Sequence, residues 1–198
     1  QMVNAKGELL TGDDVLYVLA MHRLANGDSD AGIVGTLMTN MGLELALEAG
    51  GLRLARAKVG DRYVKELMVA EGWSLGGESS GHIICGDLST TGDGVIAALQ
   101  VLAAVRASGK SLEVLASGFN PLPQVLVNVR ITKGFDLSAH PTIAEACRRV
   151  ESELEGRGRL LLRPSGTEPV IRVMVEGDDT VAIDALADEV ADAIRQAA

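Results

Sequence analysis

The heptapeptide Arg-Pro-Ser-Gly-Thr-Glu-Pro at positions 163–169 has a composition that suits an anion. Its glycine can turn backbone N–H groups toward one point, and its serine and threonine add hydroxyl donors. Its arginine presents a planar fork of donors that matches two phosphate oxygens, and a second arginine follows three residues after the loop. The same residue types also form ordinary turns, so chemistry alone leaves a phosphate loop and a plain turn as alternatives. The candidate phosphate-binding residues are Arg163, Ser165, Gly166, Thr167 and Arg172.

A second glycine-rich stretch, Gly-Gly-Glu-Ser-Ser-Gly-His, occupies positions 76–82. A carboxylate can accept hydrogen bonds from two neighbouring hydroxyls of a sugar, and flanking glycines let the backbone approach such a ligand closely. The histidine can donate to a hydroxyl or a phosphate oxygen. A solvated glycine-rich loop without a ligand is the alternative. The candidate sugar-binding residues are Glu78, Ser80 and His82.

The elements around these stretches define two kinds of domain. Strands alternate with helices before position 117, which favours an α/β layer domain. Two apolar runs, 160–162 and 170–175, are typical of strands that the heptapeptide joins. The expected strands of the first domain are 32–38, 52–59 and 83–85. Its expected helices begin at Thr11, at Asn40 (ending at Ala49), at Asp61 (ending at Glu71) and after Asp93 (ending at Ala107).

The Pro- and Gly-rich stretch Ser117–Pro123 is predicted to be a linker. After it we expect a strand at 124–131, a helix at 142–154, the two strands around the heptapeptide and a helix at 180–196. Thr142 and Glu145 fit a capping box at the start of the first of these helices. Ile183, Leu186, Val190 and Ile194 give the last helix one apolar face. This β-α-β-β-α order predicts a small α+β domain, and the domain limits are 11–117 and 118–198.

Composition narrows the class of protein. The chain has 198 residues, of which 47% are hydrophobic and 3% aromatic, and its net charge is −9. Such an acidic balance argues against nucleic acid or an anionic membrane as partner. Cys85 and Cys147 are too few for a disulfide framework and lack metal-ligand spacing, so they are interpreted as small buried residues in a reducing cytosol. No apolar run approaches the ~20 residues of a membrane span, and a cytoplasmic location is predicted.

The two motifs together are familiar. Positions 163–169 resemble the phosphate-binding loop, and positions 76–82 the sugar-binding loop, of the alpha-D-phosphohexomutase superfamily. The Ser-Ser form of the second loop and Val-Gly-Asp-Arg-Tyr-Val at 59–64 make the chain most similar to the bacterial phosphoglucosamine mutases. The resemblance implies a three-layer α/β domain followed by a small α+β domain of TATA-binding-protein-like fold. It also implies that residues 1–10 are the tail of a preceding domain.

The same resemblance implies roles for particular residues. In these enzymes the residues that match Glu78 and Ser80 hold sugar hydroxyls, and the residue that matches His82 lies close to the ligand. Lys58, Asp61 and Arg62 belong to a segment that lines the cleft, although a lysine at the end of a strand is usually only a solvated charge. The related phosphomannomutases carry histidine at the position of Asp61 and typically methionine at that of Ser79.

The mechanism of the superfamily needs two features that this chain lacks. One is a phosphoserine, and the other is an Asp-x-Asp-x-Asp-Arg loop that binds Mg²⁺. The acidic pairs at 13–14, 28–30 and 178–179 do not have that spacing. The resemblance therefore implies that the chain is a C-terminal fragment with no catalytic and no metal-binding residues of its own. The N-terminal domains of the same protein, which are not part of the chain, are its expected partners.

The implied activity of the parent protein is the interconversion of glucosamine 6-phosphate and glucosamine 1-phosphate. Glucosamine 1,6-bisphosphate is the expected intermediate and activator, and Mg²⁺ is the expected cofactor. The product is expected to be used in the synthesis of cell-wall precursors. The fragment itself is expected to bind phosphosugar weakly. Two alternatives stay open: a phosphomannomutase/phosphoglucomutase of the same superfamily, and a non-catalytic phosphosugar-binding module.

Overall fold

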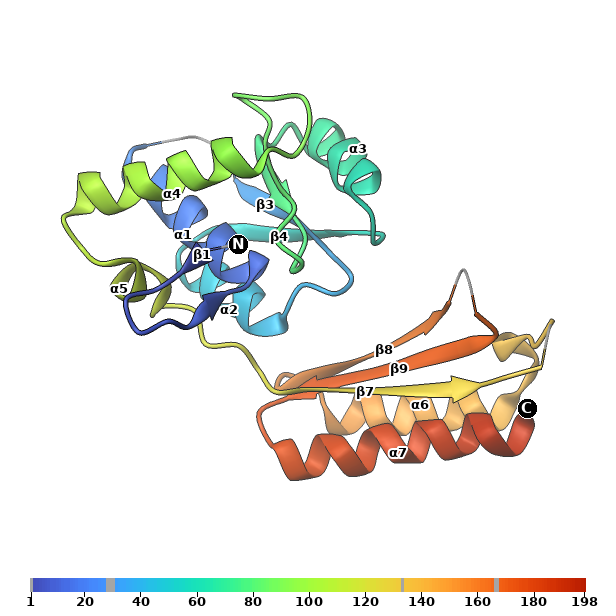
Figure 1. Ribbon diagram of the computed structural model, residues 1–198. Helices are drawn as coiled ribbons and strands as arrows, with labels where there is room; N and C mark the ends of the chain where they lie inside the picture. Colours follow the sequence, from blue (N-terminus) through green and yellow to red (C-terminus); the bar gives the residue numbers. More distant parts are fainter. Residues whose placement is uncertain (1, 28–30, 133, 166–167) are drawn as a thin grey trace. The chain divides into compact units, whose positions relative to one another are not determined.

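The computed structural model describes residues 2–27, 31–132, 134–165 and 168–198 (Figure 1). The chain divides into two compact units, Gln1–Pro121 and Leu122–Ala198, which we call the N-terminal and C-terminal units. The Pro- and Gly-rich stretch predicts this boundary after Ser117. However, Phe119 is only 4% exposed, and its ring lies 6.3 Å from the ring of Tyr17 in the N-terminal core. Residues 118–121 therefore belong with the N-terminal unit.

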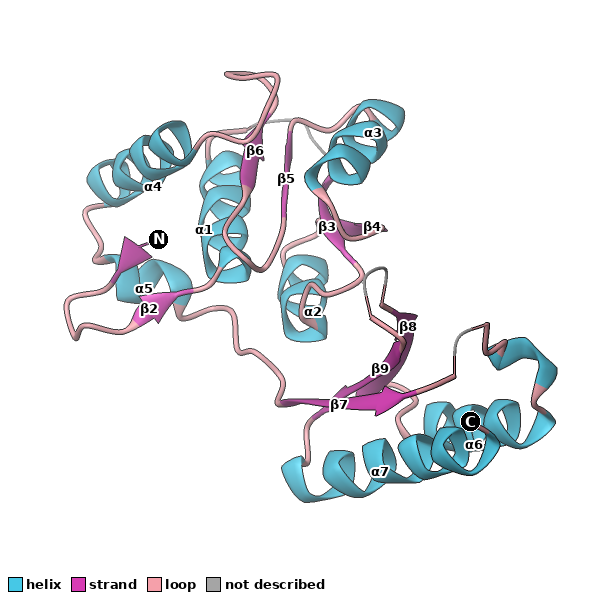
Figure 2. Cartoon of the chain, turned by 45° about the vertical axis from the view of Figure 1, so that its right-hand side comes forward, coloured by secondary structure: helices cyan, strands magenta, loops and turns pink. Residues whose placement is uncertain are grey.

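Four strands form the central sheet of the N-terminal unit, in the order β4-β3-β5-β6 (Figure 2). Strand β3 runs parallel to β4 and β5, whereas β5 and β6 are antiparallel. Every residue of β3 is buried, as expected for a parallel strand covered on both faces. The strands are β3 (Gly32–Thr36), β4 (Arg53–Ala57), β5 (Leu75–Gly77) and β6 (Ile83–Cys85), and a separate hairpin pairs β1 (Met2–Val3) with β2 (Leu9–Leu10).

Helices cover both faces of this sheet. Within β3, Ile33 belongs to a core with residues of α1, α2 and α4, whereas the next residue, Val34, belongs to a second core with α3. Neighbouring strand residues point to opposite faces, so the unit has three layers and the predicted fold is confirmed. The helices are α1 (Gly12–Ala25), α2 (Met41–Ala49), α3 (Asp61–Glu71), α4 (Gly94–Ser108) and α5 (Leu112–Ala116). The short α5, whose N-terminus is capped by the side chain of Ser111, is not expected from the sequence analysis.

Like α5, the helices α1, α2 and α4 begin at residues whose side chains cap them. Thr11 and Asp14 form a capping box at the start of α1. The side chain of Asn40 accepts a backbone N–H of α2 at 2.8 Å, and that of Asp93 accepts one of α4 at 2.8 Å. The helix starts predicted at these positions are confirmed.

The C-terminal unit is an antiparallel sheet in the order β7-β9-β8 with two helices on one face (Figures 1 and 2). Its elements are β7 (Gln124–Arg130), the 3-10 helix η1 (Leu137–Ala139), α6 (Pro141–Glu153), β8 (Gly158–Pro164), β9 (Val170–Gly177) and α7 (Thr180–Ala197). Val129, Ile171, Val173 and Val175 of the sheet share a core with Ile183, Leu186, Val190 and Ile194 of α7. The predicted β-α-β-β-α order and the apolar face of the last helix are confirmed.

The start of α6 differs from the sequence prediction. The residue before the helix is His140, its side chain makes no capping hydrogen bond, and Pro141 occupies the first turn. Proline suits this position because its fixed φ is helical and its missing N–H would have no intrahelical partner there. The capping box predicted at Thr142 and Glu145 is therefore wrong, since both residues lie inside the helix.

Candidate functional site

The loop at 76–82 leaves β5 at Gly77 and enters β6 at Ile83. The N–H of Glu78 donates to the carbonyl of His82 at 3.1 Å, and the N–H of Gly81 donates to the carbonyl of Glu78 at 2.9 Å. Gly81 has a φ of 98°, which favours glycine. The loop is therefore a closed turn held by its own backbone.

The N-terminus of α1 supports this loop. The N–H of Gly12 donates to the carbonyl of Ser79 at 2.9 Å. A methyl group at position 12 would lie 2.0 Å from the carbonyl oxygen of Glu78 and 2.7 Å from the nitrogen of Gly81. Sequence alone assigns Gly12 no role. A glycine directly after a capping threonine is the one signal for this close approach, and it is a weak one.

Gly12→Ala is expected to destabilise the N-terminal unit by about 1–3 kcal/mol and to displace the 76–82 loop, because backbone atoms have to move. Gly94→Ala is the matched control. Gly94 also begins a helix, and a methyl group there meets nothing within 4 Å, so this change is neutral or slightly stabilising. Urea unfolding together with amide NMR spectra measures both effects. Equal stability of the two variants would contradict the tight packing.

The carboxylate of Glu78 joins the loop to the start of α3. Its Oε1 accepts the N–H of Gly60 at 3.0 Å, and Gly60 precedes α3 with a φ of 127°. Gly60 has no side chain to cap the helix, so the carboxylate of Glu78 lies at an uncapped helix N-terminus, where negative charge is favourable. This contact fixes the half-buried carboxylate relative to positions 58–62.

His82 and Asp61 also come together here. Nε2 of His82 lies 3.6 Å from Oδ2 of Asp61, and both side chains are exposed. Gly92 packs against the His82 imidazole so closely that a methyl group at position 92 would lie 2.2 Å from Nε2. Glu78, His82 and Asp61 thus surround one end of α3. Gly60 and Gly92 make this arrangement possible, and the sequence analysis assigns them no role.

The other predicted cleft residues have less specific surroundings. Arg62 is exposed, and its Nε donates to Glu66 at 2.8 Å along the same helix. Lys58 is exposed, and its Nζ lies 5.8 Å from the centre of the Tyr63 ring. Ser80 is exposed and lines a mostly apolar cavity of about 310 Å³ with β1, β2, α1 and α4. None of these three side chains forms a hydrogen bond or ion pair with Glu78, and their roles stay predictions.

In the C-terminal unit, Arg163 and Arg172 lie directly opposite each other in the register of β8 and β9. Both side chains are half-buried, and the Nε atom of each is buried without a hydrogen-bond partner. Among the described residues, no carboxylate lies within ion-pairing distance of either guanidinium. Like charges directly opposite in a sheet are destabilising by roughly 0.2–1 kcal/mol. The pair therefore costs stability unless an anion binds there.

The remaining residues of the heptapeptide are only partly described. The N–H of Ser165 donates to the carbonyl of Val170 at 2.9 Å, which closes the hairpin. The N–H of Glu168 lies 3.4 Å from Oγ of Ser165. Gly166 and Thr167, which the sequence analysis also predicts to bind phosphate, lie outside the described residues.

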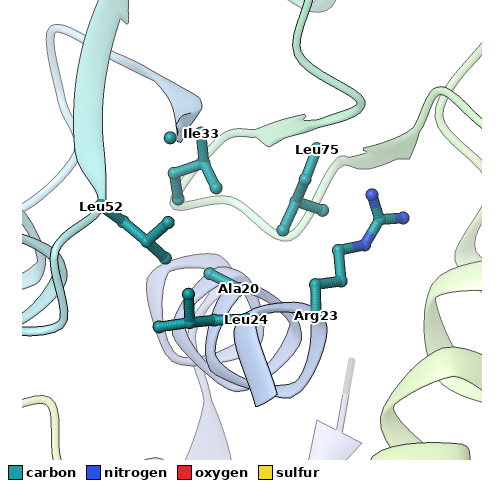
Figure 3. A pocket seen from close by; sticks show the side chains of 7 residues that line it. Ala20, Arg23, Leu24, Ile33, Leu52 and Leu75 are labelled. Carbon is teal, nitrogen blue, oxygen red and sulfur yellow. The ribbon is translucent and has the colours of Figure 1, made fainter. Parts of the chain in front are cut away.

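A further cavity lies between α1 and the central sheet (Figure 3). It measures about 10 Å³ and is lined mainly by the apolar side chains of Ala20, Leu24, Ile33, Leu52 and Leu75. The guanidinium of Arg23 extends past this cavity and binds Ser74 and Asp87. A volume of this size holds at most about one water molecule, so it is packing space and not a ligand site.

Both cysteines are free thiols, with Cys85 buried and Cys147 half-buried. Burial raises the pKa of the Cys85 thiol, and it also raises the pKa of the less buried Cys147 thiol. The thiolate forms of both residues are therefore disfavoured. Residues 2–27, 31–132, 134–165 and 168–198 contain no group of three His, Cys, Asp or Glu side chains that could hold a metal ion. These residues therefore do not fit a magnesium site. None of the helices they form has the length and apolarity to cross a bilayer.

Comparison with known sequences decides the family. The phosphoglucomutase/phosphomannomutase alpha/beta/alpha domain III matches residues 11–122, and the C-terminal domain of the same enzymes matches residues 126–193. The chain belongs to the phosphoglucomutase/phosphomannomutase family. The two matches cover most of each unit and include both glycine-containing loops.

Curated members of the phosphoglucomutase/phosphomannomutase family are close to this chain. The phosphoglucosamine mutase of Alkalilimnicola ehrlichii is 53% identical over 196 residues, which is 99% of this chain and 44% of that protein. The phosphoglucosamine mutase of Ralstonia nicotianae is 53% identical over 191 residues, 96% of this chain and 43% of that protein. The chain thus spans less than half the length of these relatives.

Two solved structures share the fold of this chain. N-acetylphosphoglucosamine mutase of Aspergillus fumigatus, in complex with GlcNAc-6P and magnesium, gives a TM-score of 0.78 at 21% identity over 95% of this chain and 47% of that one. A phosphoglucomutase/phosphomannomutase family protein of Burkholderia thailandensis gives a TM-score of 0.73 at 19% identity. The match covers 98% of this chain and 43% of that one. At these identities the likeness concerns the fold alone.

Proposed function

We propose that this chain is the C-terminal part of a phosphoglucosamine mutase, and that it binds the phosphosugar without carrying out the phosphoryl transfer. The observation that carries the proposal is the facing pair Arg163 and Arg172, whose buried Nε atoms lack partners within the described part of the chain. Relatives that are 53% identical and named phosphoglucosamine mutase support the choice of sugar.

The division of roles follows from the chemistry of the proposed reaction. The bisphosphate intermediate has to turn end for end, so one site must accept a phosphate from either end of the sugar. A fixed pair of guanidiniums on a sheet can do this, because it recognises the phosphate and not the sugar. The carboxylate of Glu78, held by the N–H of Gly60, can accept from the middle hydroxyls, which are similar in both orientations.

The phosphoserine and the magnesium ion of the proposed reaction belong to the rest of the parent protein. The solved Aspergillus relative that contains GlcNAc-6P also contains magnesium, which supports this cofactor for the family. Because no metal cluster exists in the described ranges, we assign no step of the reaction to a metal held by this chain.

Alone, the 198-residue chain is expected to show no mutase activity, because neither the serine nor the aspartate loop is present in it. The measurement is a coupled assay with glucosamine 6-phosphate, bisphosphate activator and Mg²⁺. A full-length phosphoglucosamine mutase relative serves as the positive control. Turnover by the chain that disappears when residues of the chain are mutated would overturn the proposal.

Glu78→Gln is expected to weaken binding of glucosamine 6-phosphate about tenfold or more while leaving inorganic phosphate binding unchanged. A hydrogen bond to a charged group contributes about 1.5–3 kcal/mol, and the sugar hydroxyls lose that partner. Amide NMR titrations of the chain with the two ligands measure this. Glu66→Gln, on the exposed side of α3, is the control. If glucosamine 6-phosphate binds equally to wild type and Glu78→Gln, the 76–82 loop is not the sugar site.

A further inference from the structure

The sheet of the C-terminal unit has a second face that neither α6 nor α7 covers (Figures 1 and 2). Along β7, Val125, Val127 and Val129 pack toward the helices. Their neighbours alternate to the other face, and Leu126, Asn128 and Arg130 are all exposed. On β9 the same alternation places Arg172 on that second face, because Ile171 and Val173 belong to the core.

The register aligns β7 with the arginine pair. Asn128 of β7 pairs with Arg172 of β9, which in turn pairs with Arg163 of β8. Side chains directly opposite in a sheet have Cβ atoms roughly 4.5–5.5 Å apart. Asparagine is a poor strand former, and in the described ranges the Asn128 side chain makes no hydrogen bond. Its carboxamide therefore faces solvent beside Arg172 and is free to donate to a ligand at that position.

Arg130 brings a third guanidinium to the same corner. It pairs with Val170 and is therefore the diagonal neighbour of Arg172, at a spacing of roughly 7–8 Å that a long side chain can cross. The N–H of Ile131 donates to the carbonyl of Pro169 at 2.9 Å, so this end of β7 is attached to the end of the heptapeptide. Arg130 is exposed and forms no ion pair with a described residue. Glu168, the nearby acidic residue, forms none either.

At the opposite end of the same face, an arginine is paired with a carboxylate. Gln124, Glu176 and Arg159 form the corresponding row across the three strands. Gln124 and Arg159 both donate to the buried carboxylate of Glu176. Among the described residues of this face, the arginines without a carboxylate partner are therefore those in the corner beside the heptapeptide.

We propose that β7 forms the third side of the anion site, where the guanidinium of Arg130 and the carboxamide N–H of Asn128 donate to oxygens of the bound phosphate. The ligand is the dianionic phosphate group of a phosphosugar, which would then contact all three strands of the sheet. This inference rests on the proposed function of Arg163 and Arg172 and extends their site to a strand that neither loop motif includes.

The test is a titration of the full chain with inorganic phosphate at constant ionic strength, followed by amide NMR. Arg130→Gln is expected to raise the dissociation constant about tenfold, and Asn128→Leu at least threefold, through lost donors. Arg148→Gln, the control, also removes one positive charge, but from the exposed side of α6. It is expected to change the dissociation constant less than twofold. Constant ionic strength ensures that changes in electrostatic screening are not mistaken for specific phosphate binding.

Arg163→Gln separates the inference from the proposal on which it rests. If Arg163→Gln abolishes binding while Arg130→Gln and Asn128→Leu behave like Arg148→Gln, the β7 inference is wrong and the phosphate site stands. If Arg163→Gln leaves phosphate binding intact, the proposed function fails and the inference fails with it. Thermal unfolding of every variant checks that the C-terminal unit is folded.

Discussion

Arg163→Gln will strongly weaken phosphate binding and at the same time make the ligand-free C-terminal unit more stable. In the wild type two guanidiniums lie directly opposite each other with no carboxylate partner in the described structure. Removing one relieves a repulsion of roughly 0.2–1 kcal/mol. The same change deletes charge-assisted hydrogen bonds to the anion, each about 1.5–3 kcal/mol, so affinity falls about 10- to 150-fold. Arg172→Gln is expected to act in the same way.

Unfolding in the presence and absence of phosphate measures both effects in one experiment. The wild type gains stability as phosphate is added, because the anion binds only the folded state. Without phosphate, the Arg163→Gln protein has a slightly higher free energy of unfolding than the wild type. Added phosphate raises its stability little or not at all. Arg148→Gln, which removes a distant exposed charge, should follow the wild type. A variant that is less stable without phosphate, yet equally stabilised by it, would show that the arginine pair is structural.

Arg159→Gln is expected to destabilise the C-terminal unit by about 3–5 kcal/mol. Glu176 is fully buried, and Arg159, itself mostly buried, donates to its carboxylate. Removing one member of a buried pair leaves a charge without adequate compensation in a medium where that is costly. Phosphate affinity, by contrast, should change little in whatever fraction remains folded, since this pair lies two rows away from Arg163 on the sheet.

Arg149→Gln is the matched control for this second prediction. Arg149 forms ion pairs with Glu153 and Glu189, but its side chain is 58% exposed. Exposed pairs contribute roughly 0–1 kcal/mol, so its loss should be barely measurable. Urea unfolding of the two variants gives the comparison. If both lose less than 1 kcal/mol, the buried carboxylate of Glu176 is satisfied by its other contacts and the ion pair does not support the fold.

The sequence predicts the strands and helices well because their patterns are local. The buried β3, the capped starts of α1, α2 and α4 and the amphipathic α7 all follow from residue type and spacing. The capping box at Thr142 fails because a proline at the helix start provides a competing local solution. The five-residue α5 is too short for a periodic pattern to stand out.

The candidate site is predicted less completely, because its geometry depends on pairing between distant segments. The heptapeptide marks Arg163, but its position opposite Arg172 depends on the register. A slip of one residue would turn Arg172 toward the helices. The contacts of Gly12 and Gly92 with the 76–82 loop and its histidine are likewise invisible until the chain is folded. A motif names residues, whereas the fold decides which of them meet.

The burial of Phe119 has a consequence for anyone who separates the two units. Its ring fills space beside Tyr17, and Gly118 packs against the Tyr17 hydroxyl so closely that a methyl group there would lie 2.0 Å from it. A protease that cuts between Ser117 and Phe119 would therefore remove part of the N-terminal core along with the C-terminal unit. Cleavage after Pro121 would leave that core whole. Dissection at the proline yields two intact folding units, whereas dissection at the glycine damages one of them.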